Sequence, residues 1–135
     1  RLGEQKYMTL TAMRRDADGT FHFAGLHQDL FIRRATTGKV ERIPSSGTWV
    51  GLMHDIESSL PVGQFTLHSG DVLCLYTDGI TEAKQGTTLL ENDGLVQLIE
   101  QSTGKTAEDI LESILEPMEC YEVDDDISVV VIRQI

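Results

Sequence analysis

The sequence predicts an α+β domain in which a layer of short strands packs against helices. Its first half alternates strand-like runs with turn clusters, its second half carries two helical patterns, and a last strand-like run follows them. This order of elements, with strands before helices and one last strand that rejoins the sheet, is typical of a layered α+β arrangement. A length of 135 residues with 40% apolar residues suits one domain with a real core. We therefore expect residues 1–135 to form a single domain.

Turn clusters divide the first half into short strands. The Asp-Ala-Asp-Gly cluster at 16–19 is a turn signal, and strand-like runs on both sides of it predict a hairpin. Thr37-Gly38 predicts the turn of a second hairpin. The Ser-Gly-Asp turn at 69–71 leads into an apolar run without helical period, which is typical of a strand covered on both faces. We expect strands over residues 7–13, 20–24, 30–33, 39–43, 64–67, 73–76 and 127–132.

Two helices are expected in the second half. The first pattern covers residues 94–101, and Asn92 or Asp93 can cap its start. The second begins with Thr106 followed three residues later by Asp109, a pair typical of a capping box. Apolar residues then recur at helical spacing, which predicts a helix that lays one face on the sheet. This stripe consists of Ala107, Ile110, Leu111, Ile114, Leu115 and Met118.

Two strand-like runs of the chain each adjoin aspartates. The apolar run at 73–76 leads to Asp78, and Gly79 is expected to supply a sharp turn that aims the carboxylate outward. The acidic triplet at 124–126 stands directly before the last strand-like run. If these two strands are antiparallel neighbours, both groups of carboxylates fall at the same edge of the sheet. Oxygen ligands gathered at one edge are typical of a site for Mg²⁺ or Mn²⁺.

These segments resemble the C-terminal part of the SpoIIE/RsbU-type serine phosphatases, which belong to the metal-dependent protein phosphatase 2C superfamily. The sequence Y-T-D-G-I-T-E-A at 76–83 is similar to a specific motif of this family, and D-D-I-S at 125–128 is similar to its closing motif. A-G-L-H-Q at 24–28 and G-T-W-V-G-L at 47–52 extend the resemblance over nearly the whole chain. The resemblance implies the phosphatase 2C-like fold, a layered α-β-β-α sandwich of antiparallel sheets flanked by helices.

The sequence departs from the family at its beginning. It contains neither the family's Gly-Gly-Asp strand end nor its Asp-Val-Ser/Ala-Gly-His-Gly turn. In the family, an aspartate from the first of these segments bridges both metal ions. The chain therefore resembles the C-terminal two-thirds of a phosphatase domain that lacks its N-terminal part. Residues 1–135 alone are expected to be inactive.

The resemblance assigns the metal ligands among the acidic residues. Asp78 and Asp125 are expected to hold one ion of a pair of Mn²⁺ or Mg²⁺ ions. Asp126 takes the place of Asp125 if the register is shifted by one residue. Asp124 is expected to be solvated. No side chain is expected to act as a catalytic nucleophile, because the attacking group in the family is a water activated by the metal ions.

Three further residues enter the predicted site. Gly79 can contribute to the metal site or support it. Glu82 either supports a ligand or caps the turn after Asp78, and the sequence does not decide between the two. His27 is considered because histidine can act as a general acid. However, the family places its chemistry on the metal ions, and Leu26 displaces His27 from the position that the motif requires, so we expect at most a contact.

The resemblance implies a phosphoserine/phosphothreonine protein phosphatase in a bacterial signalling pathway. Substrates of such enzymes are phosphorylated anti-anti-sigma factors with a STAS domain, which act in partner switching that controls a sigma factor. The alternative is a truncated or degenerate phosphatase fold that is not catalytic and serves as a protein-interaction module. An exposed sheet edge would also allow a homodimer.

The composition excludes several other classes. A net charge of −11 opposes binding to the phosphate backbone of nucleic acids. Two cysteines provide no disulfide framework, which favours a reducing, cytoplasmic location. No apolar stretch approaches about 18 residues, so the sequence predicts no membrane span. The opening residues do not have the pattern of a signal peptide.

Overall fold

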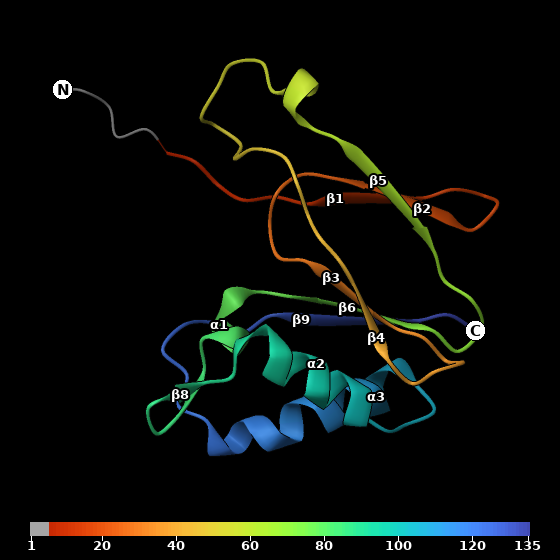
Figure 1. Cartoon of the computed structure of the whole chain (residues 1–135), viewed down its shortest axis with the longest axis vertical. Helices are drawn as coiled ribbons and strands as arrows, with labels where there is room; N and C mark the ends of the chain where they lie inside the picture. Colours follow the sequence, from red (N-terminus) through yellow and green to blue (C-terminus); the bar gives the residue numbers. More distant parts are fainter. Residues whose placement is uncertain (1–5) are drawn as a thin grey trace. The chain divides into compact units, whose positions relative to one another are not determined.

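The computed structural model describes residues 6–135, and these form two compact units (Figure 1). The first unit contains the described residues up to Asp29 together with Pro44–Leu67. The second contains Leu30–Ile43 and His68–Ile135. The single domain expected from the sequence stays a prediction, and the two units are described separately.

The first unit is built on a three-stranded antiparallel sheet in the order β1-β2-β5. The hairpin expected around residues 16–19 is confirmed, and Gly19 closes its turn at a φ of 89°. Buried phenylalanines at 21, 23 and 65 form the apolar centre of this unit, and the rings of Phe21 and Phe65 stack at 5.0 Å. The strands are β1 (Ala12–Arg15), β2 (Thr20–Ala24) and β5 (Val62–Thr66), and a short 3₁₀ helix, η1 (Glu57–Ser59), precedes β5.

The strand expected over residues 7–13 is wrong for most of its length. In the structure β1 begins only at Ala12. Earlier in this segment, Met8 forms an isolated antiparallel bridge with Val50, with N–O distances of 3.0 and 2.9 Å, and Tyr7 stacks on Trp49. The alternating pattern therefore reflects pairing with a distant loop rather than an extension of the sheet.

The second unit is built on a four-stranded antiparallel sheet in the order β4-β3-β6-β9. The second hairpin and the last strand are confirmed. Helices α2 (Glu91–Gln101) and α3 (Ala107–Leu115) cover one face of this sheet (Figure 1). A small hairpin that the sequence did not predict, β7 (Lys84–Gln85) with β8 (Thr88–Leu89), follows the first helical turn. The sheet consists of β3 (Leu30–Arg33), β4 (Val40–Ile43), β6 (Val72–Tyr76) and β9 (Val129–Arg133).

The helices of this unit partly follow the sequence prediction. Thr106 and Asp109 form the expected capping box at the start of α3. In contrast, α2 begins at Glu91, before both predicted capping residues. The residue before α2, Leu90, makes no side-chain cap, and the side chain of Asn92 instead accepts a hydrogen bond from the Tyr76 hydroxyl at 2.9 Å. The helical segments are α1 (Asp78–Thr81), α2 (Glu91–Gln101), α3 (Ala107–Leu115) and the 3₁₀ helix η2 (Glu116–Cys120).

The core of the second unit lies between the helices and the sheet. Ile110, Ile114 and Met118 of the predicted stripe are buried, whereas Leu111 is only half-buried. They pack with residues of α2 and with the inward side chains of the sheet. Burial raises the pKa of the Cys74 thiol to about 12, so this cysteine is a packing residue. The remaining core members include Phe31, Val72, Tyr76, Ile80, Leu95 and Ile99.

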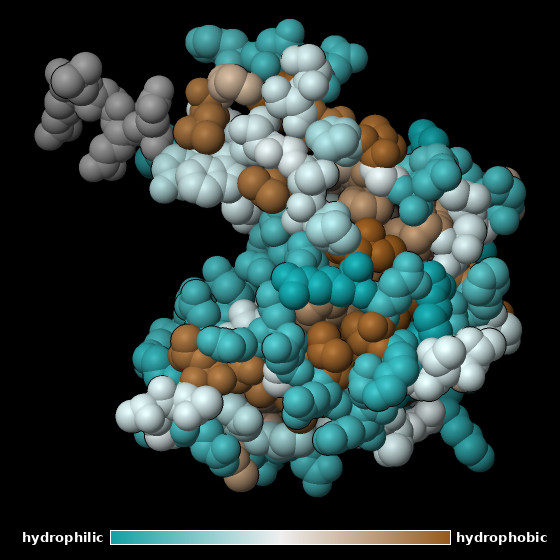
Figure 2. All heavy atoms as spheres, viewed as in Figure 1, coloured by the Kyte–Doolittle hydropathy of each residue, from teal (hydrophilic) through white to brown (hydrophobic). Residues whose placement is uncertain are grey.

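Figure 2 shows hydrophilic side chains over much of the face that is drawn, with hydrophobic side chains interspersed among them. None of the helices within residues 6–135 combines the length and the apolar character that crossing a membrane would require.

Asp71, in the turn before β6, is expected to make the stability of the protein depend on pH. Its side chain is 3% exposed. Burial alone would raise the pKa of this carboxyl, but hydrogen bonds from the Ala35 and His68 amides and from Arg34, at 2.7–3.0 Å, outweigh burial and lower it. A lowered pKa adds stability above the unfolded value near 4, and this stability is lost as the pH falls through the folded value.

We therefore expect Asp71→Asn to lower the free energy of unfolding at pH 7 by about 1–3 kcal/mol, because hydrogen bonds to a buried charge are lost. Urea titrations from pH 2.5 to 7 should show a smaller loss of stability below pH 4 in the variant than in the wild type. Glu41→Gln, which removes the exposed second partner of Arg34, is the control and should have little effect. If the free energy of unfolding depends on pH equally in Asp71→Asn and in the wild type, the lowered pKa of Asp71 is contradicted.

Candidate metal site at the shared end of two strands

The pairing of β6 with β9 brings the two predicted acidic segments to one edge of the sheet. The strands are antiparallel, with Tyr76 opposite Val129. Beyond this pair, the Thr77 amide donates to the Ser128 carbonyl at 3.0 Å. Asp78 therefore follows the end of β6 at the place where the acidic triplet leads into β9. The antiparallel arrangement that the sequence analysis required is confirmed.

Asp78 is the first residue of α1, a single helical turn. Its carbonyl oxygen accepts hydrogen bonds from the Glu82 amide at 2.8 Å and from the Thr81 hydroxyl at 3.0 Å, which hold the turn together. Its side chain is exposed, and within residues 6–135 no group donates a hydrogen bond to its carboxylate. The carboxylate is thus held on an ordered turn with its oxygens available to a ligand.

Gly79 has a role that differs from the expected one. It was predicted to supply a sharp turn, but it is a residue of α1 and is not among the glycines with a positive φ. It is buried, and a Cβ atom at this position would lie 2.4 Å from the carbonyl oxygen of Asp126 and 3.0 Å from that of Asp125. A glycine is required because the two acidic segments touch through their backbones here.

We expect Gly79→Ala to disturb the site strongly, because the added methyl group would meet backbone atoms that cannot rotate away. Alanine favours the helical turn by up to about 1 kcal/mol over glycine, so a net loss of stability would have to come from this contact. Thermal unfolding is the measurement, and overpacking of this kind typically costs about 1–3 kcal/mol.

Gly86→Ala in the β7–β8 hairpin is the comparison. Nothing lies within 4 Å of its added methyl group, so only the strain of a positive φ of 64° remains. A Gly79→Ala protein that is more stable than the wild type would show that the close approach between the two acidic segments is absent.

Within the acidic triplet, the Asp124 and Asp125 carboxylates have different partners. The Asp124 carboxylate pairs with the Lys84 ammonium at 2.5 Å, although the expected solvent exposure of Asp124 is confirmed at 74%. Asp125 is exposed, and one of its oxygens accepts the Asp126 amide at 2.8 Å. The backbone of Lys84 also exchanges two hydrogen bonds with Glu122, at 2.9 and 2.7 Å. The sequence analysis did not predict this role of Lys84. The sequence signal that could have indicated it is a lysine directly after the T-E-A sequence.

The donor atoms at this edge fit a hard metal ion. Asp78 and Asp125 offer only carboxylate oxygens, both side chains are exposed, and neither pairs with a cation in the described part of the chain. Residues 123–127 line a hollow of about 380 Å³. Oxygen ligands of this kind suit Mg²⁺ or Mn²⁺. Among residues 6–135, no group of three or more His, Cys, Asp or Glu side chains is arranged to hold a metal ion.

The other predicted site residues occupy separate positions. Glu82 ends α1, where its amide donates to the carbonyl of Asp78, and its side chain is exposed. Both alternatives for the Glu82 side chain stay predictions. His27 belongs to the first unit, where its ring lies 2.9 Å from the Thr9 hydroxyl. Its contact with the site stays a prediction.

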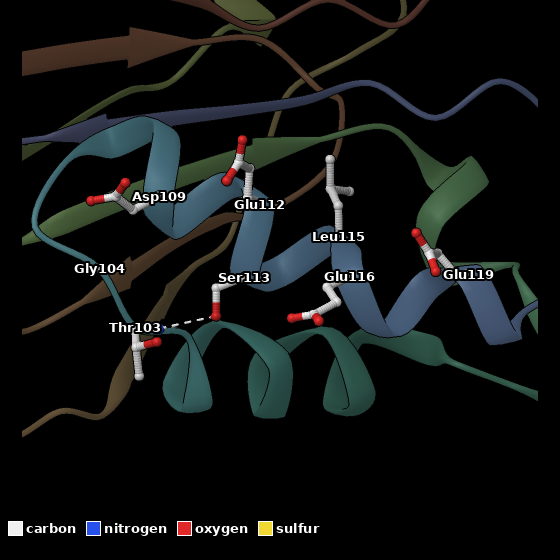
Figure 3. Close-up of a pocket in the computed structure, with 8 residues that line it drawn as sticks. All are labelled: Thr103, Gly104, Asp109, Glu112, Ser113, Leu115, Glu116 and Glu119. Carbon is white, nitrogen blue, oxygen red and sulfur yellow. Dashed lines mark hydrogen bonds between the residues drawn. The ribbon is translucent and has the colours of Figure 1, made fainter.

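A larger hollow of about 700 Å³ lies on α3 and the loop before it (Figure 3). Four carboxylates line it, and the Thr103 amide donates to the Ser113 hydroxyl at 3.1 Å beside them. One of the four, Asp109, belongs to the capping box. No residue of the two acidic motifs lines this hollow, so it is distinct from the candidate metal site. Its acidic residues are Asp109, Glu112, Glu116 and Glu119.

The antiparallel sheets and the helices that cover them form the fold of a phosphatase 2C-type domain, and comparison with known proteins identifies the family. Residues 1–134 match the family of Stage II sporulation protein E (SpoIIE). The chain belongs to this family. Over 89 residues it is 28% identical to the phosphoserine phosphatase RsbU of Bacillus subtilis, a stretch that covers 62% of this chain and 27% of RsbU.

Solved structures share the fold. The phosphatase domain of SpoIIE from Bacillus subtilis, in a crystal presoaked with Mn, superimposes with a TM-score of 0.64 at 20% identity, over 94% of this chain and 56% of that one. The RsbU and RsbW domains of a Mycobacterium tuberculosis protein give a TM-score of 0.76 at 20% identity, over 93% of this chain and 37% of that one. The chain thus spans little more than half of the first structure, and about a quarter of RsbU is matched.

Proposed function

We propose that this chain is part of a metal-dependent phosphoserine/phosphothreonine protein phosphatase, with Asp78 and Asp125 as ligands of one ion of a Mn²⁺ or Mg²⁺ pair. The observation that carries the proposal is the meeting of the two acidic motifs at the end of β6 and β9, where Gly79 touches the backbone of Asp126. Membership of the SpoIIE family and the name of the relative RsbU support the reaction class.

The chain's own residues would perform the positioning part of the reaction. Asp78 is held by the turn of α1, and Asp125 by the backbone contacts of residues 126–128. The pair of ions, when bound, would supply a deprotonated water for in-line attack on phosphorus. Asp126 replaces Asp125 in this proposal if the register is shifted, while Glu82 supports the turn. Further ligands would come from motifs that this sequence does not contain.

The substrate in this proposal is a phosphorylated serine or threonine on a partner protein. By its resemblance to SpoIIE/RsbU-type enzymes, we infer a STAS-domain anti-anti-sigma factor in a partner-switching pathway, acting in the cytoplasm. Self-association would use the outer edge of β9, which is an edge strand of the sheet. The net charge of −11 argues against nucleic acid as a partner.

The test is hydrolysis of a phosphoserine peptide by the polypeptide at its natural length. Turnover should require millimolar Mn²⁺ or Mg²⁺ and should stop with a chelator. Residues 1–135 alone should show negligible turnover with the same metal. Robust metal-dependent hydrolysis by residues 1–135 would show that the proposed ligand set is misplaced. A folded natural-length polypeptide without turnover would favour the alternative, a non-catalytic interaction module.

A further inference from the structure

We propose that Thr77 is a positioning residue for this metal site, whose hydroxyl group sets the spacing between the Asp78 and Asp125 carboxylates. The inference rests on the proposed function, because it concerns the same site. Thr77 precedes Asp78 directly and lies beside the segment that carries Asp125. From the sequence, Thr77 is expected chiefly to be a strand or turn residue.

The Thr77 hydroxyl makes two hydrogen bonds to the second acidic motif. It accepts the Ser128 amide at 2.9 Å and donates to the Asp126 carbonyl at 3.3 Å. A hydroxyl has one hydrogen to donate and lone pairs that accept, so a single side chain can make both bonds. The Thr77 amide adds a third bond, to the Ser128 carbonyl at 3.0 Å. Thr77 thus binds the chain on both sides of Ile127.

The hydroxyl takes the place of a backbone carbonyl. In a regular antiparallel pair, the carbonyl of Thr77 would accept the Ser128 amide. Here that carbonyl instead accepts the Ile80 amide at 3.3 Å, which starts the turn of α1. Because the backbone turns away to place Asp78 on α1, the pairing with Ser128 passes to the side chain. Only serine and threonine carry a hydroxyl at this distance from the backbone.

Two of the contacts between the acidic segments meet at one atom, the Asp126 carbonyl oxygen. The Thr77 hydroxyl binds the carbonyl of Asp126, and Gly79 packs against that same carbonyl. Without the hydroxyl, the Ser128 amide and the Asp126 carbonyl would lose their partner, and the position of Asp125 relative to Asp78 would no longer be set. Metal ligands need to be held within about 0.5 Å of their productive geometry, so a small shift would weaken metal binding.

Thr77→Val and Thr77→Ser separate the hydroxyl from the shape of the side chain. Valine keeps the branched shape and removes both bonds, whereas serine keeps the hydroxyl and removes a methyl group. Thr88→Val is the matched control, because Thr88 lies on β8, is exposed and is outside the proposed site. All variants are made in the natural-length polypeptide. If the valine variant does not fold, the same measurements are made on Thr77→Ala, which also lacks the hydroxyl.

Three measurements apply to each variant. Hydrogen exchange of the Ser128 amide, without metal, should be faster in Thr77→Val than in wild type. The Mn²⁺ dissociation constant, from the electron paramagnetic resonance signal of free Mn²⁺, should rise about 10–100-fold, as for partners that orient metal ligands. The kcat at saturating Mn²⁺ should fall much less. Thr77→Ser should stay within about threefold of wild type, since the partner groups keep their bonds.

The outcomes distinguish this inference from the proposed function. A wild-type polypeptide without Mn²⁺ binding would overturn the proposed function and this inference with it. Wild-type Mn²⁺ binding that Thr77→Val leaves unchanged would overturn the role of Thr77 alone. Equal losses in Thr77→Val and Thr77→Ser would assign the effect to the methyl group and also overturn the role of the hydroxyl. A loss in Thr77→Val that serine restores and Thr88→Val does not share would support the inference.

Discussion

Asp78→Asn and Asp125→Asn are each expected to lower the Mn²⁺-dependent phosphatase rate of the natural-length polypeptide by at least about 10–100-fold. That range is typical for the loss of groups that only orient metal ligands, and a ligand itself should matter at least as much. Asparagine keeps the shape of the side chain and removes one charge. Both carboxylates are exposed at the shared end of β6 and β9, so folding should survive. Phosphopeptide hydrolysis at several Mn²⁺ concentrations is the measurement.

The neighbouring acidic residues provide the controls for this prediction. Asp124→Asn should have a small effect, because Asp124 is 74% exposed and pairs with Lys84 rather than with the proposed ligands. If Asp125→Asn keeps full activity and Asp126→Asn is inactive, the ligand is Asp126, one residue further along the motif. Wild-type activity of Asp78→Asn would contradict the assignment of the metal site itself.

Ile114→Ala is expected to destabilise the protein by about 2–5 kcal/mol, as replacements of large buried side chains by alanine do. Ile114 is 0% exposed and lies on the face of α3 that packs against the sheet. The methyl and methylene groups that alanine lacks would leave a cavity in a core built from α2, α3 and the strands. Urea unfolding followed by circular dichroism gives the free energy and also reports whether the folded variant keeps its helices.

Leu111→Ala is the matched comparison within the same helix. The sequence predicted a similar loss at both positions, since both belong to the apolar stripe. In the structure Leu111 is only half-buried, so less apolar surface is returned to water and the loss should be smaller. No change in stability for Ile114→Ala would mean that α3 is not packed on the sheet.

The local patterns of the sequence were sufficient for several elements of the fold. The hairpin at residues 16–19, the strand β6 and the capping box of α3 all depend on residues within a few positions of one another. Turn chemistry, apolar runs and capping pairs act over such short separations. The sequence also indicated the α+β class and the family, because four short segments carry the resemblance over nearly the whole chain.

Errors arose where a distant residue overrode the local pattern. The helix α2 begins at Glu91, ahead of both predicted caps, and the side chain of Asn92 bonds instead with Tyr76, 16 residues away. The segment at 7–13 reads as a strand, but Met8 pairs with Val50 in a loop. The helix itself was predicted and only its start differs, whereas residues 7–11 form no strand of the sheet.

For the candidate site, the sequence by itself determined which carboxylates to consider and that two strand ends had to meet. Tertiary structure decided how they meet. Thr77 and Asp126 are 49 residues apart, and Lys84 and Asp124 are 40 apart, so their contacts exist only once β6 and β9 have paired. The requirement for Gly79 is likewise steric and comes from the opposite segment. A sequence pattern records residue types along one chain, whereas a contact of this kind depends on the register between two strands.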